Sequence, residues 1–390
     1  MELYEREKVI EEFVELVTTF SASRNERKIG DLLLEKLQEI GCVDLYEDNA
    51  GQMIGGNTGN IYGILPGTLP GSILFCAHMD RGELLPKRDG TIPEIRPQIR
   101  EGRIYSDGTT ILAADDVAGI VSILTALRHL KTSSKPHCSV EVLFTVCEED
   151  AALGSCYADY SRIHSKLAYA MDSNGPLGRI VNGAPSGAKL KVELFGRGAH
   201  YGSAPENGRD AVLAAAELLC GLRQGRIDED TVANFPVLHA GGEATYGICE
   251  YAVLKGQAQS HNPEKLSEYI RYFERFCCDK LEPREIQWEF ENQILYHAYV
   301  VPPESACVRL VSKALENLGE EAYTELGNAC LDSHHLNAHG IESVALGMGY
   351  RLNHSNQEYQ EIDLLLKNSQ LIENILLEYG NNPTPYTILK

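Results

Sequence analysis

The feature that most constrains the fold is a series of short, nearly continuous apolar runs that alternate with helical patterns. Residues 71–77 read Gly-Ser-Ile-Leu-Phe-Cys-Ala, and residues 139–146 read Ser-Val-Glu-Val-Leu-Phe-Thr-Val. An apolar run of this length suits a strand that is buried on both faces. Between the two runs, residues 116–131 carry apolar side chains at helical spacing. Strands that alternate with helices predict an α/β layered domain with a largely parallel central sheet.

The pattern changes near residue 184. Residues 188–196 alternate apolar and polar side chains, as in a strand with one solvated face. The patterns up to residue 299 predict, in order, a strand, a helix, two strands, a helix and a strand, which together form a compact α+β insert. The helix–strand alternation then resumes. We therefore predict one α/β domain built from residues 1–183 and 300–390, interrupted by an inserted domain at 184–299.

Charge and cysteine usage exclude some classes of function. The chain has 35 Lys and Arg against 56 Asp and Glu, a formal net charge of −21 at pH 7. A surface this acidic repels phosphate backbones and anionic lipids, so we expect neither a nucleic-acid partner nor a membrane partner. The N-terminus carries no signal-peptide pattern, and the 11 cysteines include no Cys-x-x-Cys motif. These features predict a cytoplasmic protein with reduced thiols.

Groups that can bind a metal ion follow several of the predicted strands. His78 and Asp80 end the first apolar run, and their spacing places both side chains on one face of an extended chain. Other such groups lie at the ends of further predicted elements: Asp115, Asp116, Glu148, Glu149, Asp150, Asp172 and His354. Each has an ordinary structural alternative, such as a His–Asp pair, a capped helix N-terminus or a solvated acidic turn. Together they match a dinuclear zinc or similar site at the carboxyl ends of the strands.

These motifs resemble those of the dinuclear zinc exopeptidases, the family that includes peptidase T, aminoacylase-1, glutamate carboxypeptidase and succinyl-diaminopimelate desuccinylase. The similar segments are residues 77–80, 106–119, 145–149 and 353–358, and residues 198–208 are similar to the family's lid signature. The likeness is strongest to the peptidase T-like branch and covers nearly the whole chain. It implies a catalytic domain, 1–183 with 300–390, and a lid and dimerisation domain at 184–299.

The resemblance implies a metal-binding role for five residues. His78 and Asp172 would hold one zinc ion, Glu149 and His354 would hold the other, and Asp115 would bridge the two. The implied cofactors are therefore two Zn²⁺ ions, with other divalent cations such as Co²⁺ or Mn²⁺ as alternatives.

Three further residues receive catalytic roles from the resemblance. Asp80 would orient His78, and Glu148 would be the general base that takes a proton from the metal-bridging water. His200, reaching from the lid of the same subunit or of a partner, would stabilise the tetrahedral oxyanion. The Asp115–Asp116 peptide bond is often cis in this family.

Two segments depart from the family pattern, and both concern substrate recognition. Gln259 stands where relatives usually carry an arginine that binds a substrate carboxylate. A neutral amide cannot supply the bidentate fork of arginine. Residues 329–335 read Ala-Cys-Leu-Asp-Ser-His-His where the family has a glycine-rich segment. The pair His334 and His335 is either a third metal-binding patch or part of a polar surface.

We therefore predict metal-dependent hydrolysis of peptide bonds in short peptides, resembling that of a tripeptide aminopeptidase. The partners implied are a short peptide substrate and a second copy of the chain, bound through the lid as a homodimer. Gln259 keeps a second hypothesis open, an amidohydrolase or deacylase that acts on N-acyl amino acids or related amides. A third hypothesis is a non-catalytic binding protein that retains the fold.

Overall fold

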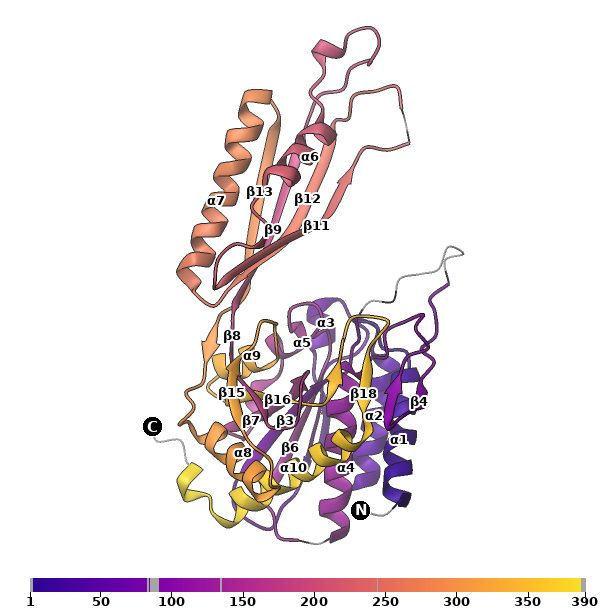
Figure 1. The fold of residues 1–390 in the computed structure, drawn as a ribbon, viewed down its shortest axis with the longest axis vertical. Helices are drawn as coiled ribbons and strands as arrows, with labels where there is room; N and C mark the ends of the chain where they lie inside the picture. The colour runs from indigo at the N-terminus through magenta and orange to yellow at the C-terminus, as the bar shows by residue number, and fades with distance from the viewer. Residues whose placement is uncertain (1–2, 83, 85–90, 134, 244, 387–390) are drawn as a thin grey trace. The chain divides into compact units, whose positions relative to one another are not determined.

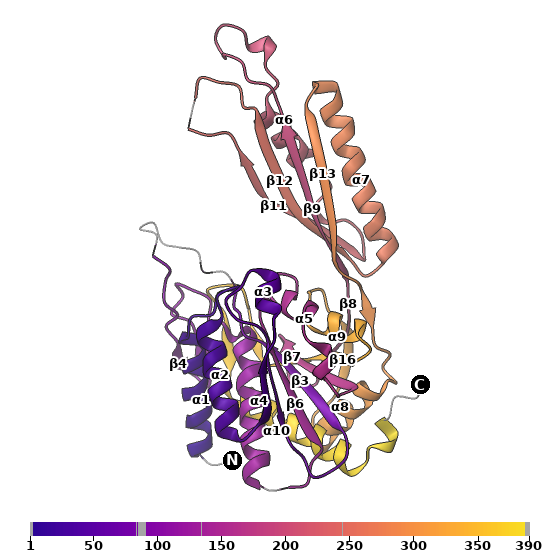
Figure 2. The ribbon, with the colours of Figure 1, turned by 180° about the vertical axis from the view of Figure 1, so that it is seen from behind.

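The computed structural model describes residues 3–82, 84, 91–133, 135–243 and 245–386, and the chain divides into two compact units. Unit 1 is Met1–Gly183 with Val300–Lys390, and unit 2 is Ala184–Tyr299. Figures 1 and 2 show the helices and strands of both units from opposite sides. Each unit has its own sheet and is described by itself.

The centre of unit 1 is a nine-stranded sheet in the order β1-β2-β6-β3-β7-β16-β8-β14, with β15 beside β8. The four neighbouring central strands run parallel: β6 (Ser139–Thr145), β3 (Ser72–His78), β7 (Leu167–Ser173) and β16 (Glu342–Gly347). The prediction of a layered α/β fold with a largely parallel central sheet is confirmed. All residues of β3 after Ser72 are buried, as its continuous apolar run predicts.

Antiparallel pairing appears only toward the edges of this sheet. β2 runs antiparallel to β6, β1 to β2, and β8 to β16, whereas β15 runs parallel to β8. The bounds of these outer strands are β1 (Val43–Glu47), β2 (Ile61–Leu65), β8 (Arg179–Ala184), β14 (Tyr299–Val300) and β15 (Tyr323–Leu326).

The long helices of unit 1 pack on the sheet and on one another. Their bounds are α1 (Leu3–Thr18), α2 (Arg27–Ile40), α4 (Ala114–Ser133), α8 (Ala306–Asn317) and α10 (Ile362–Asn381). α4 contacts β3 and β7 as well as α1, α2 and α10, and it is therefore buried along most of its length. α2 ends at Gly41, whose φ of 93° is the left-handed conformation that closes a helix. The short helices are α3 (Ala50–Ile54), α5 (Leu153–Cys156) and α9 (Ser333–Ala338).

A small sheet, which the sequence did not predict, joins two distant parts of unit 1. Its order is β17 (Tyr350–Arg351), β18 (Tyr359–Glu361), β5 (Arg103–Tyr105) and β4 (Gln98–Arg100). Tyr359 of β18 lies opposite Tyr105 of β5. This pairing brings the loop between β17 and β18 beside the chain that leads into α4.

Unit 2 is a five-stranded antiparallel sheet with two helices, α6 (Ala211–Gly221) and α7 (Pro263–Leu281), on one face (Figure 1). Its strands, in spatial order, are β10 (Gly225–Arg226), β11 (Thr231–Ala240), β12 (Tyr251–Ser260), β9 (Ser186–Phe195) and β13 (Gln287–Tyr296). Apolar residues alternate along β9 and face the helices, as its sequence pattern predicts. The two strands predicted between the helices of the insert are β11 and β12.

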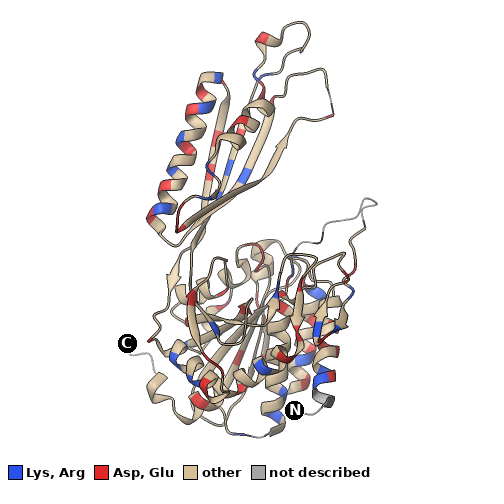
Figure 3. Ribbon diagram, viewed as in Figure 1, with Lys and Arg blue, Asp and Glu red and all other residues tan. Residues whose placement is uncertain are grey.

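Charged side chains are spread over both units, and they alternate in sign along α7 (Figure 3). All eleven cysteines are free thiols. Among the described helices, none is both long and apolar enough to span a bilayer.

The aromatic core of unit 2 gives a stability prediction. Phe273 is fully buried, and its ring lies 4.9 Å from that of Phe235 and 5.4 Å from that of Phe290. Removing this ring leaves a cavity, so we expect Phe273→Ala to lower the free energy of unfolding of unit 2 by about 3–5 kcal/mol. The single tryptophan, Trp288, packs against the same core, so its fluorescence during urea unfolding reports on this unit.

Phe195, the last residue of β9, is the matched control, because it lies in the same unit but is 37% exposed. Phe195→Ala should lower the stability by less than about 1 kcal/mol. Equal effects of the two substitutions would show that the Phe273 ring is not central to this core.

Candidate metal centre

Five side chains that can bind a metal ion meet at one end of the central sheet of unit 1. His78 is the last residue of β3, Asp172 is the next-to-last residue of β7, and Glu149 follows β6. Asp115 lies at the start of α4, and His354 lies in the loop between β17 and β18. This end of the sheet is where the parallel strands have their carboxyl ends, the usual ligand site of open α/β sheets.

The five residues form two groups that share Asp115. His78, Asp115 and Asp172 make one group and Asp115, Glu149 and His354 the other, with the ligand atoms of each group within 4.8 Å of one another. The Nε2 atom of His78 is 3.1 Å from Oδ1 of Asp115, and the Nε2 atom of His354 is 3.3 Å from Oδ2. Each oxygen of the shared carboxylate therefore faces a different group, which is the arrangement of a bridging ligand.

The donor atoms fit two divalent cations of the zinc type. Imidazole nitrogens and carboxylate oxygens without a thiolate suit Zn²⁺ and its first-row neighbours. Burial, with the charge of Asp115 next, raises the pKa of Asp172 and raises that of Glu149 to about 7. Carboxylates raise one another's pKa because like charges repel, and a bound cation removes this repulsion.

The tautomer of His78 is set by a backbone group. Its Nδ1 atom lies 2.9 Å from the backbone carbonyl oxygen of Asp80, to which it donates, and Nε2 then faces Asp115. The side chain of Asp80 is farther away, with Oδ1 3.5 Å from Nδ1. The Asp80 carboxylate instead accepts the N–H groups of Glu148 and Glu149, at 2.9 and 3.2 Å. Asp80 therefore contacts His78 mainly through its main chain.

Glu148 lies beside the two groups. Its side chain is buried, and Oε1 accepts no hydrogen bond from the described residues. Burial raises the pKa of Glu148 well above its ordinary value, and the charge of Asp172 raises it further. A carboxylate with a raised pKa and an open lone pair is suited to accept a proton.

Several supporting residues went unnoticed in the sequence. Glu358 accepts the N–H groups of Leu112, Ala113 and Asp115, at 2.7, 3.0 and 3.2 Å, and so holds the chain that enters α4. The hydroxyl of Tyr350 donates to Oδ1 of Asp172 at 2.9 Å. Glu358 lies within a motif that resembles the family, which is a signal that could have found it, whereas Tyr350 carries no such signal.

The chain around Asp115 is held from both sides. Asn353 donates its side-chain N–H to Oδ2 of Asp115 at 2.7 Å. Asp116 accepts the backbone N–H of His78 at 3.2 Å and that of Gly119 at 3.0 Å. The peptide bond between Asp115 and Asp116 is cis, as the resemblance implies. Asp116 therefore ties α4 to the end of β3.

The eighth predicted site residue, His200, lies in unit 2. It follows β9, and its Nδ1 atom accepts the N–H group of Gly202 at 3.1 Å. The imidazole is exposed and stacks on Tyr201, with ring centroids 5.5 Å apart. A second chain segment supports this loop, since His200 forms a β-bridge with Gly247.

The pair His334 and His335 fits neither of the two alternatives predicted for it. Both side chains are buried, so they are not part of a polar surface. Among the described residues, neither belongs to a group of three metal-binding side chains. Nearby, Asp332 accepts hydrogen bonds from Thr145 at 2.6 Å and from the thiol of Cys76 at 3.2 Å. The segment 329–335 is therefore anchored to β6 and β3.

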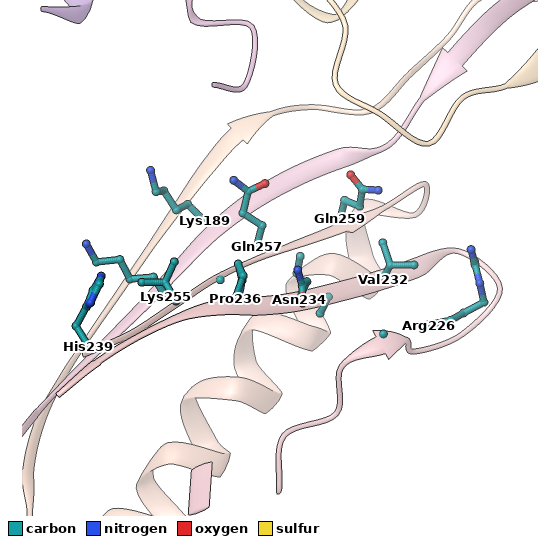
Figure 4. A pocket seen from close by; sticks show the side chains of 14 residues that line it. Lys189, Arg226, Val232, Asn234, Pro236, His239, Lys255, Gln257 and Gln259 are labelled. Atoms are coloured by element: carbon teal, nitrogen blue, oxygen red, sulfur yellow. The ribbon is translucent and has the colours of Figure 1, made fainter. Parts of the chain in front are cut away.

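Gln259 lines a pocket of about 810 Å³ on the face of the unit 2 sheet that is opposite the helices. The side chains of Lys189, Gln257 and Gln259 point to the same side (Figure 4). Lys189 lies opposite Gln257 in the register of β9 and β12. The pocket is also lined by Arg226 and Lys255, and no acidic side chain is among the described residues that line it. This pocket is therefore suited to an anionic group.

Comparison with known proteins identifies relatives along nearly the whole chain. The model of Peptidase family M20/M25/M40 matches residues 74–378. The chain is 31% identical to the uncharacterized protein YqjE of Bacillus subtilis, over 95% of this chain and 98% of that protein. It is 24% identical to peptidase T of Shouchella clausii, over 94% of this chain and 95% of that protein.

Two solved structures share both sequence and fold with the chain. Aminopeptidase PepT from Bacillus cereus is 32% identical with a TM-score of 0.79, over 96% of this chain and 98% of that one. A tripeptidase from Staphylococcus aureus is 28% identical with a TM-score of 0.85, over 97% of this chain and 99% of that one.

The raised pKa of His354 predicts that metal binding depends on pH. The hydrogen bond with Asp115 is the largest cause that raises the pKa of His354, and the charge of Glu149 raises it further. Burial lowers this pKa, but the net result is a pKa of about 9. The imidazole therefore carries a proton at pH 7, and a metal ion can bind Nε2 only after that proton leaves. We expect Zn²⁺ binding to the metal-free protein to release protons, and its affinity to rise with pH up to about 9.

Calorimetric titration at pH 7 in buffers of different ionisation enthalpy measures the number of protons released. His354→Gln should release about one proton fewer than the wild type. His239→Gln, which changes an exposed histidine in unit 2, is the control and should match the wild type. Equal release by wild type and His354→Gln would contradict the assignment.

Proposed function

The chain belongs to peptidase family M20/M25/M40, and from this membership we propose that it is an aminopeptidase that releases the N-terminal residue of short peptides, resembling a tripeptidase. The observation that carries the proposal is the pair of ligand groups that share Asp115, with the unpaired Oε1 of Glu148 beside them. The peptidase T and tripeptidase relatives support the same substrate class. Membership in this family makes the chain a hydrolase of the metallopeptidase type, which removes the basis for a purely binding role.

We propose that the metal ions are two Zn²⁺. His78 and Asp172 would hold one, Glu149 and His354 the other, and Asp115 would bridge them. When bound, two such ions lower the pKa of a shared water and polarise the scissile carbonyl. Co²⁺ or Mn²⁺ could replace zinc, because imidazole and carboxylate ligands also accept them.

In this proposal Glu148 transfers the proton. Its carboxylate would take a proton from the attacking water and then deliver it to the leaving amine. The buried position of Glu148 excludes bulk water, which would otherwise compete for that proton. Asp80 would keep His78 in the tautomer whose Nε2 faces the metal centre.

His200 would stabilise the oxyanion that forms on the carbonyl oxygen, by donating a hydrogen bond to it. This role requires unit 2, of the same subunit or of a partner, to close on the metal centre during the reaction. A homodimer through unit 2 and a cytoplasmic location stay predictions.

Substitution of Glu148 tests the mechanism. Gln keeps the shape of Glu but cannot accept a proton, so Glu148→Gln should lower kcat for a tripeptide by about 10²–10⁴-fold. Metal content, measured by plasma mass spectrometry on the same sample, should stay at the wild-type value because Glu148 is outside both ligand groups. Unchanged turnover would exclude Glu148 as the general base.

Gln259 favours the second candidate, an amidohydrolase that acts on N-acyl amino acids or related amides. A panel of dipeptides, tripeptides and N-acyl amino acids separates the two candidates. Under the leading proposal, tripeptides have the highest kcat/KM of the panel. Hydrolysis of N-acyl amino acids without tripeptide cleavage would favour the second candidate instead.

The pocket that contains Gln259 gives a sharper prediction about the substrate's free carboxylate. Gln259→Arg adds a bidentate cation, so it should lower KM for a tripeptide with a free carboxylate by about tenfold. It should leave KM for the corresponding C-terminal amide unchanged. Gln257→Arg, on the same strand and face, is the control for added charge alone. If both variants lower KM equally for both peptides, position 259 does not bind the carboxylate.

A further inference from the structure

The segment that joins α1 to α2 contacts both of the strand-end loops that carry the candidate site. The carbonyl oxygen of Ser21 accepts the N–H group of Arg81 at 3.1 Å. The hydroxyl of Ser23 donates to Oδ2 of Asp80 at 2.6 Å, and Arg24 donates to Asp150 at 2.5 Å. Residues 21–26, which we call the clasp, therefore hold the loop after β3 and the loop after β6 together.

Glu26 is the deepest residue of the clasp. It is fully buried, and its Oε1 atom accepts the N–H groups of Cys147 at 3.0 Å and of Arg24 at 2.9 Å. Its Oε2 atom has no hydrogen-bond partner among the described residues. Burial, and next the charge of Asp80, raise the pKa of Glu26 to about 7. A buried carboxyl with an unpaired oxygen destabilises the fold, so its place calls for a reason other than stability.

The target of Glu26 is the turn that presents Glu148 and Glu149. The three consecutive N–H groups of residues 147–149 all donate to buried carboxylates, the first to Glu26 and the next two to Asp80. Cys147 has a φ of 53°, a left-handed conformation that is strained for a non-glycine residue and persists only when its surroundings hold it. The direction of both glutamate side chains depends on this turn, because they follow Cys147 directly.

We propose that Glu26 is a positioning residue for hydrolysis, which acts through the N–H group of Cys147, with Asp80 and Ser23, to hold Glu148 and Glu149 toward the metal centre. The inference rests on the proposed role of Glu148. A residue that acts through the general base changes the chemical step and leaves substrate binding intact. Its loss therefore lowers kcat and spares KM.

Substitution of Glu26 tests this role. Glu26→Ala removes the acceptor for Cys147, and we expect kcat for a tripeptide to fall about 10–100-fold, with KM changed less than about threefold. Glu26→Gln keeps an oxygen that accepts the same two N–H groups, so its kcat should stay within about threefold of the wild type.

Glu141 offers a matched control. It is equally buried and lies in β6, and it accepts hydrogen bonds from Tyr62, Ser165 and the N–H group of His164. Glu141→Ala removes a buried carboxylate without touching the turn at residues 147–149. Like Glu26→Ala, it leaves a backbone N–H group without its acceptor, and the folded enzyme should keep kcat within about threefold of the wild type.

Two outcomes would overturn the positioning role: kcat unchanged in Glu26→Ala, or an equal loss of kcat in Glu141→Ala. If Glu26→Ala fails to fold, Ser23→Ala tests the positioning role instead, because it removes only the hydroxyl that donates to Asp80. A fall in kcat of about 3–10-fold at constant KM supports the clasp, and an unchanged kcat overturns it.

Glu148→Gln, assayed beside these variants, separates the two proposals. An active Glu148→Gln overturns both the mechanism and the clasp's role in it. An inactive Glu148→Gln beside an unaffected Glu26→Ala overturns the role of the clasp alone.

Discussion

The position of the Asp115 carboxylate is the constraint on which the candidate site of unit 1 depends. One of its oxygens faces His78 and the other faces His354, so this single side chain joins the end of β3 to the loop between β17 and β18. Asp172 and Glu148 are buried beside it, and their charges repel one another at short range. Such a cluster is stable only when cations neutralise it or protons bind to it, and its donor atoms fall into two groups that share Asp115.

The parallel centre of the sheet was predictable because each of its strands is a short apolar run in the sequence. The run that forms β3 is apolar without interruption, and the predicted position of His78 at its end follows directly from that run. The antiparallel edges and the sheet of β17, β18, β5 and β4 were not predictable. The four strands of this small sheet have two or three residues each, and Tyr359 pairs with Tyr105 across most of the chain. Pairing of this kind is set by tertiary packing and leaves no periodic trace in the sequence.

The candidate site, like the fold, was predictable where its residues lie in local sequence motifs and not where tertiary packing brings residues together. The residues of the two candidate ligand groups could be named from the motifs around His78, Asp115, Glu149 and His354. Their supports could not, since Tyr350 reaches Asp172 from a strand that no pattern predicted. The roles of individual atoms also escaped the sequence. Asp80 was predicted to orient His78, but the sequence does not show that its carbonyl oxygen contacts the imidazole while its carboxylate accepts an N–H group of the next loop.

One device recurs around the metal centre: a buried carboxylate accepts backbone N–H groups from a loop that carries a functional residue. Glu358 does this for the chain before Asp115, Asp80 for Glu148 and Glu149, and Asp116 for His78. An ionised carboxylate accepts stronger hydrogen bonds than a carbonyl group, and N–H groups that point at it stabilise its charge where water is excluded. Loops held in this way have little freedom to move when a ligand binds or leaves. The acidic residues of this site therefore have two functions. Some can bind cations, and the others hold the backbone that carries those cation-binding residues.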